Sequence, residues 1–201
     1  MFTWITAVLH RTGLLGVGLL MLLENIVPVI PSELILPMAG FEAANGAFDP
    51  VLAVIAGTVG SILGGTAWYA LGHRLGLERM QRFAGRHGRW LTMTPAEICR
   101  ADGWFRRWGP AAVLIGRALP GVRGVICIPA GIARMPLGPF LLWSSLGALA
   151  WSGMLVAAGY LLQTRYTQVE HWLNPVTAAF VGFAVLVYVV RWLRFKPERA
   201  G

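Results

Sequence analysis

The segment ENIVPVIPSELILPMAG, residues 24–40, decides the fold. It is apolar enough to enter a membrane, yet it carries two glutamates and three prolines. Proline removes a backbone donor and clashes with the preceding turn, so prolines this close together exclude one straight helix. Interrupted backbone at membrane depth survives only where it is buried in protein or lines a watery cavity. We therefore predict that residues 12–41 form a re-entrant helical hairpin.

The composition places the whole chain in a membrane. Of its 201 residues, 56% are hydrophobic and only 13% are charged, about half the usual charged fraction of soluble domains. Long uncharged runs match the roughly 20 apolar residues that a spanning helix needs, although the last run is shorter. We predict an all-α integral membrane protein with a single membrane domain over residues 1–201. The predicted crossings are 51–72, 137–162 and 175–190. The first contains Gly60 and Gly64, whose spacing predicts a face for close helix packing.

A second broken segment, residues 110–135, repeats the pattern of the first. A hairpin crosses zero times and the following helix crosses once, so two successive units have opposite orientation, as in the inverted repeats of many transporters. We expect repeat 1 over 12–72 and repeat 2 over 110–162. An uninterrupted span over 12–30 would instead break the repeat and place the N-terminus inside. The matched pairs are Pro28 with Pro120 and Pro37 with Pro129, each 92 positions apart, and Gly40 with Gly131 and Tyr69 with Tyr160, each 91 apart. The residues expected to shape the hairpins are Pro28, Pro31, Pro37, Gly40, Pro120, Gly121, Pro129 and Gly131.

Residues 73–109 are polar and strongly basic, with eight arginines against three acidic residues. A capping box at Thr94–Glu97, with Pro95 in the first helical position, predicts a helix that Gly109 ends. We expect amphipathic helices on the membrane surface. Cytoplasmic segments carry the excess of Lys and Arg, so this segment and the C-terminus are predicted to be cytoplasmic. In a membrane protein such basic residues indicate contact with anionic phospholipid headgroups, not nucleic acid.

Four charged residues lie inside the two broken segments: Glu24 and Glu33 in the first, Arg117 and Arg123 in the second. Each costs roughly 2.5–3.5 kcal/mol at a helix centre, so they must meet one another, water or a ligand. One interpretation is two buried Glu–Arg pairs that hold the hairpins together. The other is a substrate site, in which the guanidiniums bind a phosphate bidentately and the carboxylates exchange protons.

The sequence predicts no metal, no cofactor and no catalytic residues. The two cysteines and four histidines have no metal-ligand spacing, and Cys99 and Cys127 are not expected to form a disulfide. A spanning protein with this charge pattern is predicted to be a carrier and not an enzyme.

The two broken segments resemble the signatures of the DedA family, which shares its core with the VTT or SNARE-associated membrane proteins. The first signature is residues 24–40, and the second is GRALPGVR, residues 116–123, followed by PAG at 129–131. The resemblance covers roughly residues 15–160. It departs from the family at Ala118 and Leu119, where a bulkier pair is expected.

The resemblance implies the re-entrant, inverted-repeat architecture and a multi-pass protein of the bacterial cytoplasmic membrane. It also implies a lipid transporter for polyprenyl phosphate, specifically undecaprenyl phosphate. Arg117 and Arg123 would bind the headgroup, and Glu24 and Glu33 would couple its movement to protons or Na⁺. Three alternatives stay open: a proton- or cation-coupled carrier of small ions, an intramembrane lipid phosphatase or phosphotransferase, and a scaffold that binds partners through residues 73–109. The oligomeric state is open too, a homodimer being one option.

Overall fold

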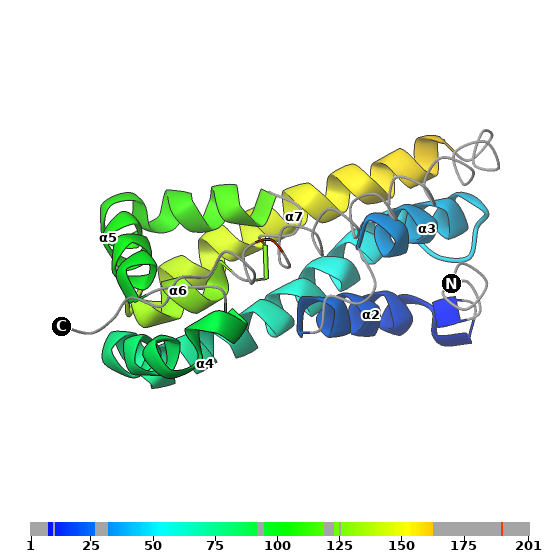
Figure 1. Ribbon diagram of the computed structural model, residues 1–201. Helices are drawn as coiled ribbons and strands as arrows, with labels where there is room; N and C mark the ends of the chain where they lie inside the picture. The colour runs from blue at the N-terminus through cyan, green and yellow to red at the C-terminus, as the bar shows by residue number, and fades with distance from the viewer. Residues whose placement is uncertain are drawn as a thin grey trace.

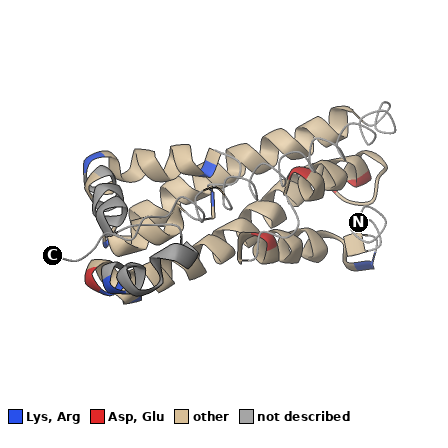
Figure 2. Ribbon diagram, in the orientation of Figure 1, with Lys and Arg blue, Asp and Glu red and all other residues tan. Residues whose placement is uncertain are grey.

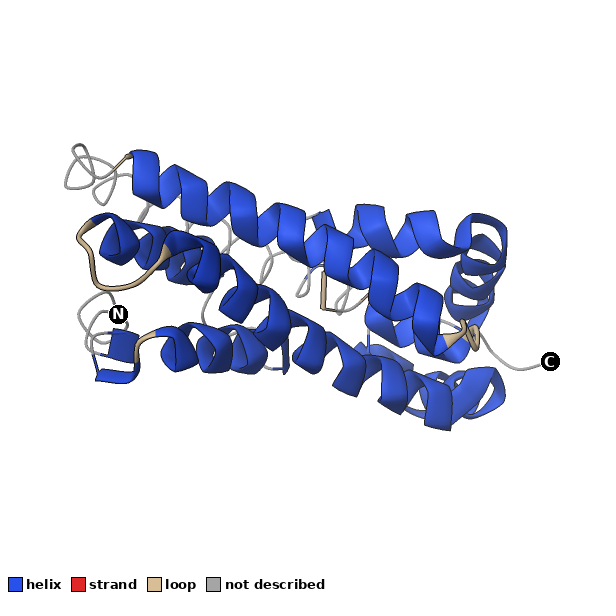
Figure 3. Cartoon of the chain, turned by 180° about the vertical axis from the view of Figure 1, so that it is seen from behind, coloured by secondary structure: helices blue, strands red, loops and turns tan. Residues whose placement is uncertain are grey.

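The computed structural model of the chain describes residues 8–9, 11–26, 32–91, 95–118, 123–124, 126–162 and 190. All regular structure in these residues is α-helical, as the sequence predicts (Figures 1 and 3). The named helices are α2 (Leu14–Ile26), α3 (Ser32–Ala44), α4 (Pro50–Leu91), α5 (Pro95–Ala118), α6 (Cys127–Ile132) and α7 (Leu137–Leu161).

Two helices are long and apolar enough to cross a membrane. They are the 30 residues Pro50–Arg79 of α4 and the 25 residues of α7. At 1.5 Å per residue, the shorter one is roughly 38 Å long, which exceeds the ~30 Å hydrocarbon core of a bilayer. The two helices run in opposite directions (Figure 1). The third predicted crossing, 175–190, lies outside the described residues except for Val190.

The apolar faces of these two helices point outward. Only 39% of the apolar window in α4 and 33% of that in α7 is buried, whereas a core helix of a soluble protein would be mostly buried. Large apolar side chains such as Leu63, Leu142 and Met154 are more than half exposed. Exposed apolar surface of this extent is expected where the solvent is lipid.

The first broken segment folds as two short helices. α2 and α3 contain 13 residues each, so each is roughly 20 Å long and too short to span the bilayer alone. Both inner ends lie near the middle of the molecule (Figure 1). Pro37, the third of the three prolines, lies inside α3. Four of the residues expected to shape the hairpins, Pro28, Pro31, Pro120 and Gly121, lie outside the described residues.

Each short second helix packs on the spanning helix of the other half of the chain: α3 contacts α7, and α6 contacts α4. Gly40 of α3 lies against the carbonyl oxygen of Val156, and Gly131 of α6 lies against that of Tyr69. A Cβ atom at either glycine would overlap that oxygen. Gly40 and Gly131 therefore serve close helix packing, and the same contact occurs twice, which supports the predicted inverted repeat.

The spanning helices themselves follow a different offset from the one predicted. Gly72 lies against the carbonyl of Ile128, and Gly159 lies against the carbonyl of Pro37. Gly72 and Gly159 are thus equivalent, 87 positions apart, whereas Gly40 and Gly131 are 91 apart. The predicted pairing of Tyr69 with Tyr160 is corrected: in these contacts the counterpart of Tyr160 is His73. The reason is that the second half has four fewer residues between its two glycines.

Close packing between α2 and α4 also depends on glycine. Gly60 lies against the carbonyl of Gly18, and a Cβ atom at Gly64 would lie 2.5 Å from the Cβ atom of Asn25. Small residues spaced four apart let helix backbones approach in a membrane. This confirms the packing role that the Gly60–Gly64 spacing suggests.

At the basic end, α4 does not stop at residue 72 but continues to Leu91, with a left-handed residue at Gly76 (φ 66°). The first of the amphipathic helices predicted within residues 73–109 is therefore not separate from the span. It is the part of α4 that follows Gly76. α5 begins at Pro95, and its geometry breaks at Gly109 (φ 39°, ψ −114°), as the sequence predicts. Figure 2 shows charged positions at the two ends of the molecule and where the inner helix ends meet.

Candidate functional site

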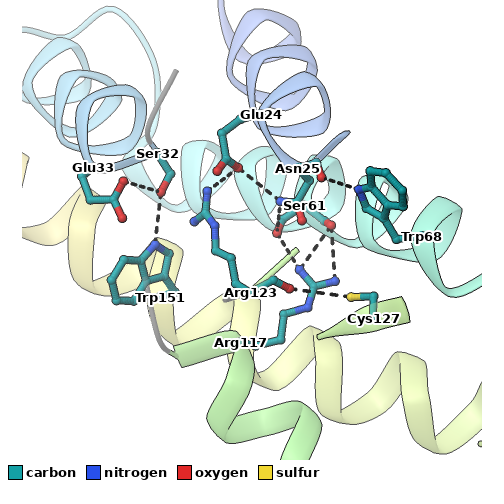
Figure 4. Close-up of polar contacts among 10 residues, drawn as sticks. All are labelled: Glu24, Asn25, Ser32, Glu33, Ser61, Trp68, Arg117, Arg123, Cys127 and Trp151. Carbon is teal, nitrogen blue, oxygen red and sulfur yellow. Dashed lines mark hydrogen bonds and ion pairs between the residues drawn. The ribbon is translucent and has the colours of Figure 1, made fainter. Parts of the chain in front are cut away.

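The inner ends of the broken segments bring three of the four predicted charges close together. Glu24 lies in the last turn of α2, Arg117 in the last turn of α5, and Arg123 between α5 and α6. Figure 4 shows these side chains pointing into one polar cluster on α4. Residues almost a hundred positions apart thus share one site, because each follows or precedes a break in its apolar segment.

Arg123 forms an ion pair with Glu24, from Nη2 to Oε2 (Figure 4). Their side chains are 6% and 11% exposed, so water screens the pair little. The pair joins the first half of the chain to the second. Removing one partner of such a buried pair leaves an uncompensated charge, which is far costlier than losing a pair on the surface.

Arg117 is buried more completely, at 1% exposure, and has no carboxylate within 4.0 Å among the described residues. Its Nη1 donates to Ser61 Oγ at 2.9 Å and to the Ser61 carbonyl at 3.3 Å, and its Nη2 donates to that carbonyl at 3.4 Å. Its Nε has no hydrogen-bond partner among the described residues. The guanidinium therefore retains an unused donor there and is not held in an ion pair.

Two glycines make room for Arg117. A Cβ atom at Gly65 of α4 would overlap Nη2 of the guanidinium, and one at Gly147 of α7 would lie 2.7 Å from the Cβ atom of Arg117. Both spanning helices therefore carry glycine where the arginine crosses between them. An added side chain at either position would displace the charge from its place.

Asn25 connects the two arginine sites. Its Nδ2 donates to Ser61 Oγ at 3.0 Å and to Glu24 Oε2 at 3.3 Å. The backbone carbonyl of Asn25 accepts from Trp68 Nε1 at 2.8 Å. Asn25 and Ser61 are 4% and 3% exposed. Sequence reasoning missed both residues. The available signal was an amide next to Glu24 within an apolar run, and a serine on the glycine-lined face of α4.

Glu33 does not join the ion pair. It is the second residue of α3 and is half-buried, and it accepts from Ser32 Oγ at 3.3 Å. Trp151 Nε1 donates to the same hydroxyl at 3.4 Å. No cation lies within 4.0 Å of Glu33 among the described residues, so two Glu–Arg pairs do not form there. Figure 4 shows Glu33 to one side of the Glu24–Arg123 pair.

The cluster contains a single thiol. Cys127 is the first residue of α6, is fully buried and free, and lies with its Sγ 3.7 Å from the carbonyl of Arg123. Within the described part of the chain, no three His, Cys, Asp or Glu side chains gather in a group that could hold a metal ion. The chemistry that these residues offer is charge recognition by two guanidiniums and two carboxylates.

Comparison with known proteins places the chain in a family. Residues 30–161 match the family model of the VTT domain. No solved structure matches the chain.

Several curated bacterial proteins match along nearly their whole length. An "Alkaline phosphatase-like protein" of Lactococcus lactis subsp. cremoris (strain MG1363) is 34% identical over 97% of this chain and 92% of its own. The "Undecaprenyl phosphate transporter A" of Staphylococcus aureus (strain NCTC 8325 / PS 47) is 31% identical over 94% and 95%. That of Bacillus subtilis (strain 168) is 30% identical over 92% and 87%. The chain belongs to the VTT-domain family, that is, to the DedA family of membrane proteins.

Proposed function

We propose that the protein moves a polyprenyl phosphate, undecaprenyl phosphate, across the bacterial cytoplasmic membrane. The observation that carries the proposal is Arg117, a fully buried guanidinium with a free donor and no carboxylate within 4.0 Å among the described residues. A buried cation is costly unless something neutralises it. A phosphate monoester is the anion whose geometry a guanidinium matches best, through two parallel N–H···O bonds.

Arg123 would supply the second guanidinium. In the structure the guanidinium of Arg123 is paired with Glu24, so a phosphate would compete with that carboxylate for the same N–H donors. Protonation of Glu24 would weaken the ion pair and release Arg123 to the substrate. Binding of the phosphate would then be coupled to uptake of a proton by Glu24. Glu33 would be the second coupling carboxylate, and Na⁺ could take the place of the proton.

The lipid tail need not enter the protein. The outward faces of α4 and α7 are apolar, and the polar cluster lies where the inner helix ends meet. A polyprenyl chain could stay in the bilayer while the headgroup passes through the cluster. The names of the two transporter relatives agree with this substrate.

We place the basic end of the molecule, with the C-terminus, on the cytoplasmic side, because cytoplasmic segments carry the excess of arginine. The turn between α3 and α4 is then external. A membrane-impermeant maleimide should label Ala47→Cys on intact cells but Gly103→Cys only after lysis. The opposite pattern would reverse the orientation.

One observation favours a second candidate, a cation-coupled carrier of small ions. Glu33 is half-buried and lacks a cationic partner among the described residues, so it is available to bind an ion. Ion uptake into liposomes that contain no polyprenyl phosphate, unchanged when the lipid is added, would favour this function over lipid transport.

The substrate assignment is tested by native mass spectrometry of the purified protein with undecaprenyl phosphate and with undecaprenol. We expect the wild type to retain the phosphate lipid selectively and Arg117→Gln and Arg123→Gln to lose at least tenfold in affinity. Arg107→Gln, at an exposed arginine of α5, is the matched control and should bind as wild type does. Equal retention of both lipids by the wild type would overturn the assignment.

A further inference from the structure

A second concentration of arginine lies at the basic end of the molecule, away from the polar cluster. There a pocket of about 550 Å³ opens between α4, on both sides of Gly76, and the turn that joins α6 to α7. Its charged lining is Arg74, Arg79, Arg82 and Arg134 with Glu78, and His73 lines it too. The cluster residues Arg117 and Arg123 do not line it.

The arginines of this pocket form no ion pair within the described part of the chain. All four are exposed, and none has a carboxylate within 4.0 Å among the described residues, Glu78 included. Four guanidiniums and one carboxylate therefore give the pocket an uncompensated positive charge. A basic surface helix would spread such charges over a convex face, but here they line a concavity formed by two separate parts of the chain.

The backbone on both sides of the pocket is held in a defined shape. Gly76 adopts a left-handed conformation (φ 66°), and so does Arg134 (φ 52°), which is uncommon for a residue with a side chain. Close packing of Gly131 against the carbonyl of Tyr69 and the amide of His73 fixes α6 on α4 next to the pocket. The two walls are therefore fixed relative to each other.

The position of the pocket relative to the membrane follows from the charge pattern of α4. The run 50–72 of α4 contains no charged residue, and the first charge after it, Arg74, already lines the pocket. The pocket thus begins where the apolar part of the spanning helix ends, at the level where phosphate headgroups lie.

We propose that this pocket is a second binding site, which takes a phosphate monoester at the membrane surface. Guanidiniums on two walls can each donate two hydrogen bonds to phosphate oxygens. The pocket is separate from the Arg117 cluster, so the proposal holds whether or not the protein transports lipid. If the protein does transport lipid, the pocket receives the headgroup at the basic end of its path.

The test uses phenylglyoxal, which modifies accessible guanidiniums, on the intact protein in phosphatidylcholine nanodiscs. Labelling of each arginine is followed by peptide mass mapping, with dodecyl phosphate, dodecanol or inorganic phosphate added. We expect dodecyl phosphate to slow labelling of Arg79 and Arg134 at least threefold and dodecanol to have no effect. Exposed Arg11 and Arg107, outside the pocket, are internal controls and should label at an unchanged rate.

The two phosphate arms identify the source of the ligand. Protection by dodecyl phosphate alone would show that the site takes a membrane-anchored monoester, and protection by inorganic phosphate at the same concentration would show that the phosphate group suffices. Equal slowing at Arg107, or no slowing at Arg79 and Arg134, would overturn the proposal.

Two variants separate this pocket from the Arg117 cluster. Arg134→Asn removes one guanidinium while asparagine tolerates the left-handed backbone, and it should raise the concentration of dodecyl phosphate that half-protects Arg79 about tenfold. Arg117→Gln should leave that protection unchanged. If Arg117→Gln abolished the protection of Arg79, the pocket would not be an independent site. A negative result in a lipid transport assay would bear on the proposed function and not on this pocket.

Discussion

At the scale of the residue, the defining feature is a buried arginine that has no carboxylate within 4.0 Å among the described residues. Arg117 depends on the hydroxyl and carbonyl oxygens of Ser61, and Ser61 Oγ also accepts from Asn25. One serine thus positions both the uncompensated guanidinium and the residue next to Glu24. The charged residues could be predicted from the sequence because a charge in an apolar run is conspicuous. Ser61 could not, since serine is common in spanning helices and only the fold shows which one faces the arginine.

We expect Ser61→Ala to lower undecaprenyl phosphate affinity about fivefold to tenfold, because Arg117 and Asn25 both lose an acceptor. Leaving a buried donor unpaired costs about 1–3 kcal/mol, so unfolding stability should fall too. The matched control is Ser152→Ala, whose buried Oγ has no hydrogen-bond partner in the structure. Titration of the lipid against both variants by native mass spectrometry decides the matter, and equal affinities would remove Ser61 from the site.

The Glu24–Arg123 pair makes a separate prediction. Glu24→Gln and Arg123→Gln each leave one buried charge uncompensated, and each should lower the free energy of unfolding by about 3–5 kcal/mol. The double variant leaves no charge behind and should lose less than the two single variants together. Denaturant unfolding in detergent measures this coupling. Strictly additive losses would mean that the two groups do not interact.

At the scale of the element, glycine decides how the helices meet. The sequence predicts the broken segments, the Gly60–Gly64 packing face and the break at Gly109, because each follows from local chemistry. It does not show that α3 packs on α7 and α6 on α4, since that pairing depends on contacts between distant parts of the chain. The sequence does not show either that α3 continues through Pro37, in a helix that packs on α7.

Substitution of these glycines tests the cross-packing. Gly40→Ala and Gly131→Ala place a Cβ atom on a carbonyl oxygen of the opposite spanning helix. Overpacking of this kind costs about 1–3 kcal/mol, and a backbone obstacle cannot move aside as a side chain can. Gly153→Ala in α7, where nothing lies within 4 Å, should be neutral or slightly stabilising. Equal thermal stability of all three variants would contradict the packing.

At the scale of the whole molecule, two long apolar antiparallel helices, α4 and α7, pack against shorter helices whose inner ends meet at a cluster of charges (Figures 1 and 2). Contacts between the halves recur at matched glycines, at an offset of 91 for the hairpin helices and 87 for the spanning helices. The sequence offset alone finds the first value but not the second, because the four extra residues of the first half lie between Gly40 and the start of α4, where no residue is distinctive. The arrangement places a cluster of charges within an apolar molecule, as the proposed movement of an amphiphile requires.

The most direct measurement of lipid transport uses sealed proteoliposomes with undecaprenyl phosphate in both leaflets and phosphatase added outside. With wild-type protein, hydrolysis should proceed beyond the outer-leaflet pool, because lipid from the inner leaflet is brought out. With Arg117→Gln it should stop at that pool, and with Ser152→Ala it should proceed as in the wild type. Phosphate release without added phosphatase would reveal an enzyme instead. Arrest of the wild-type protein at the outer-leaflet pool would contradict lipid transport.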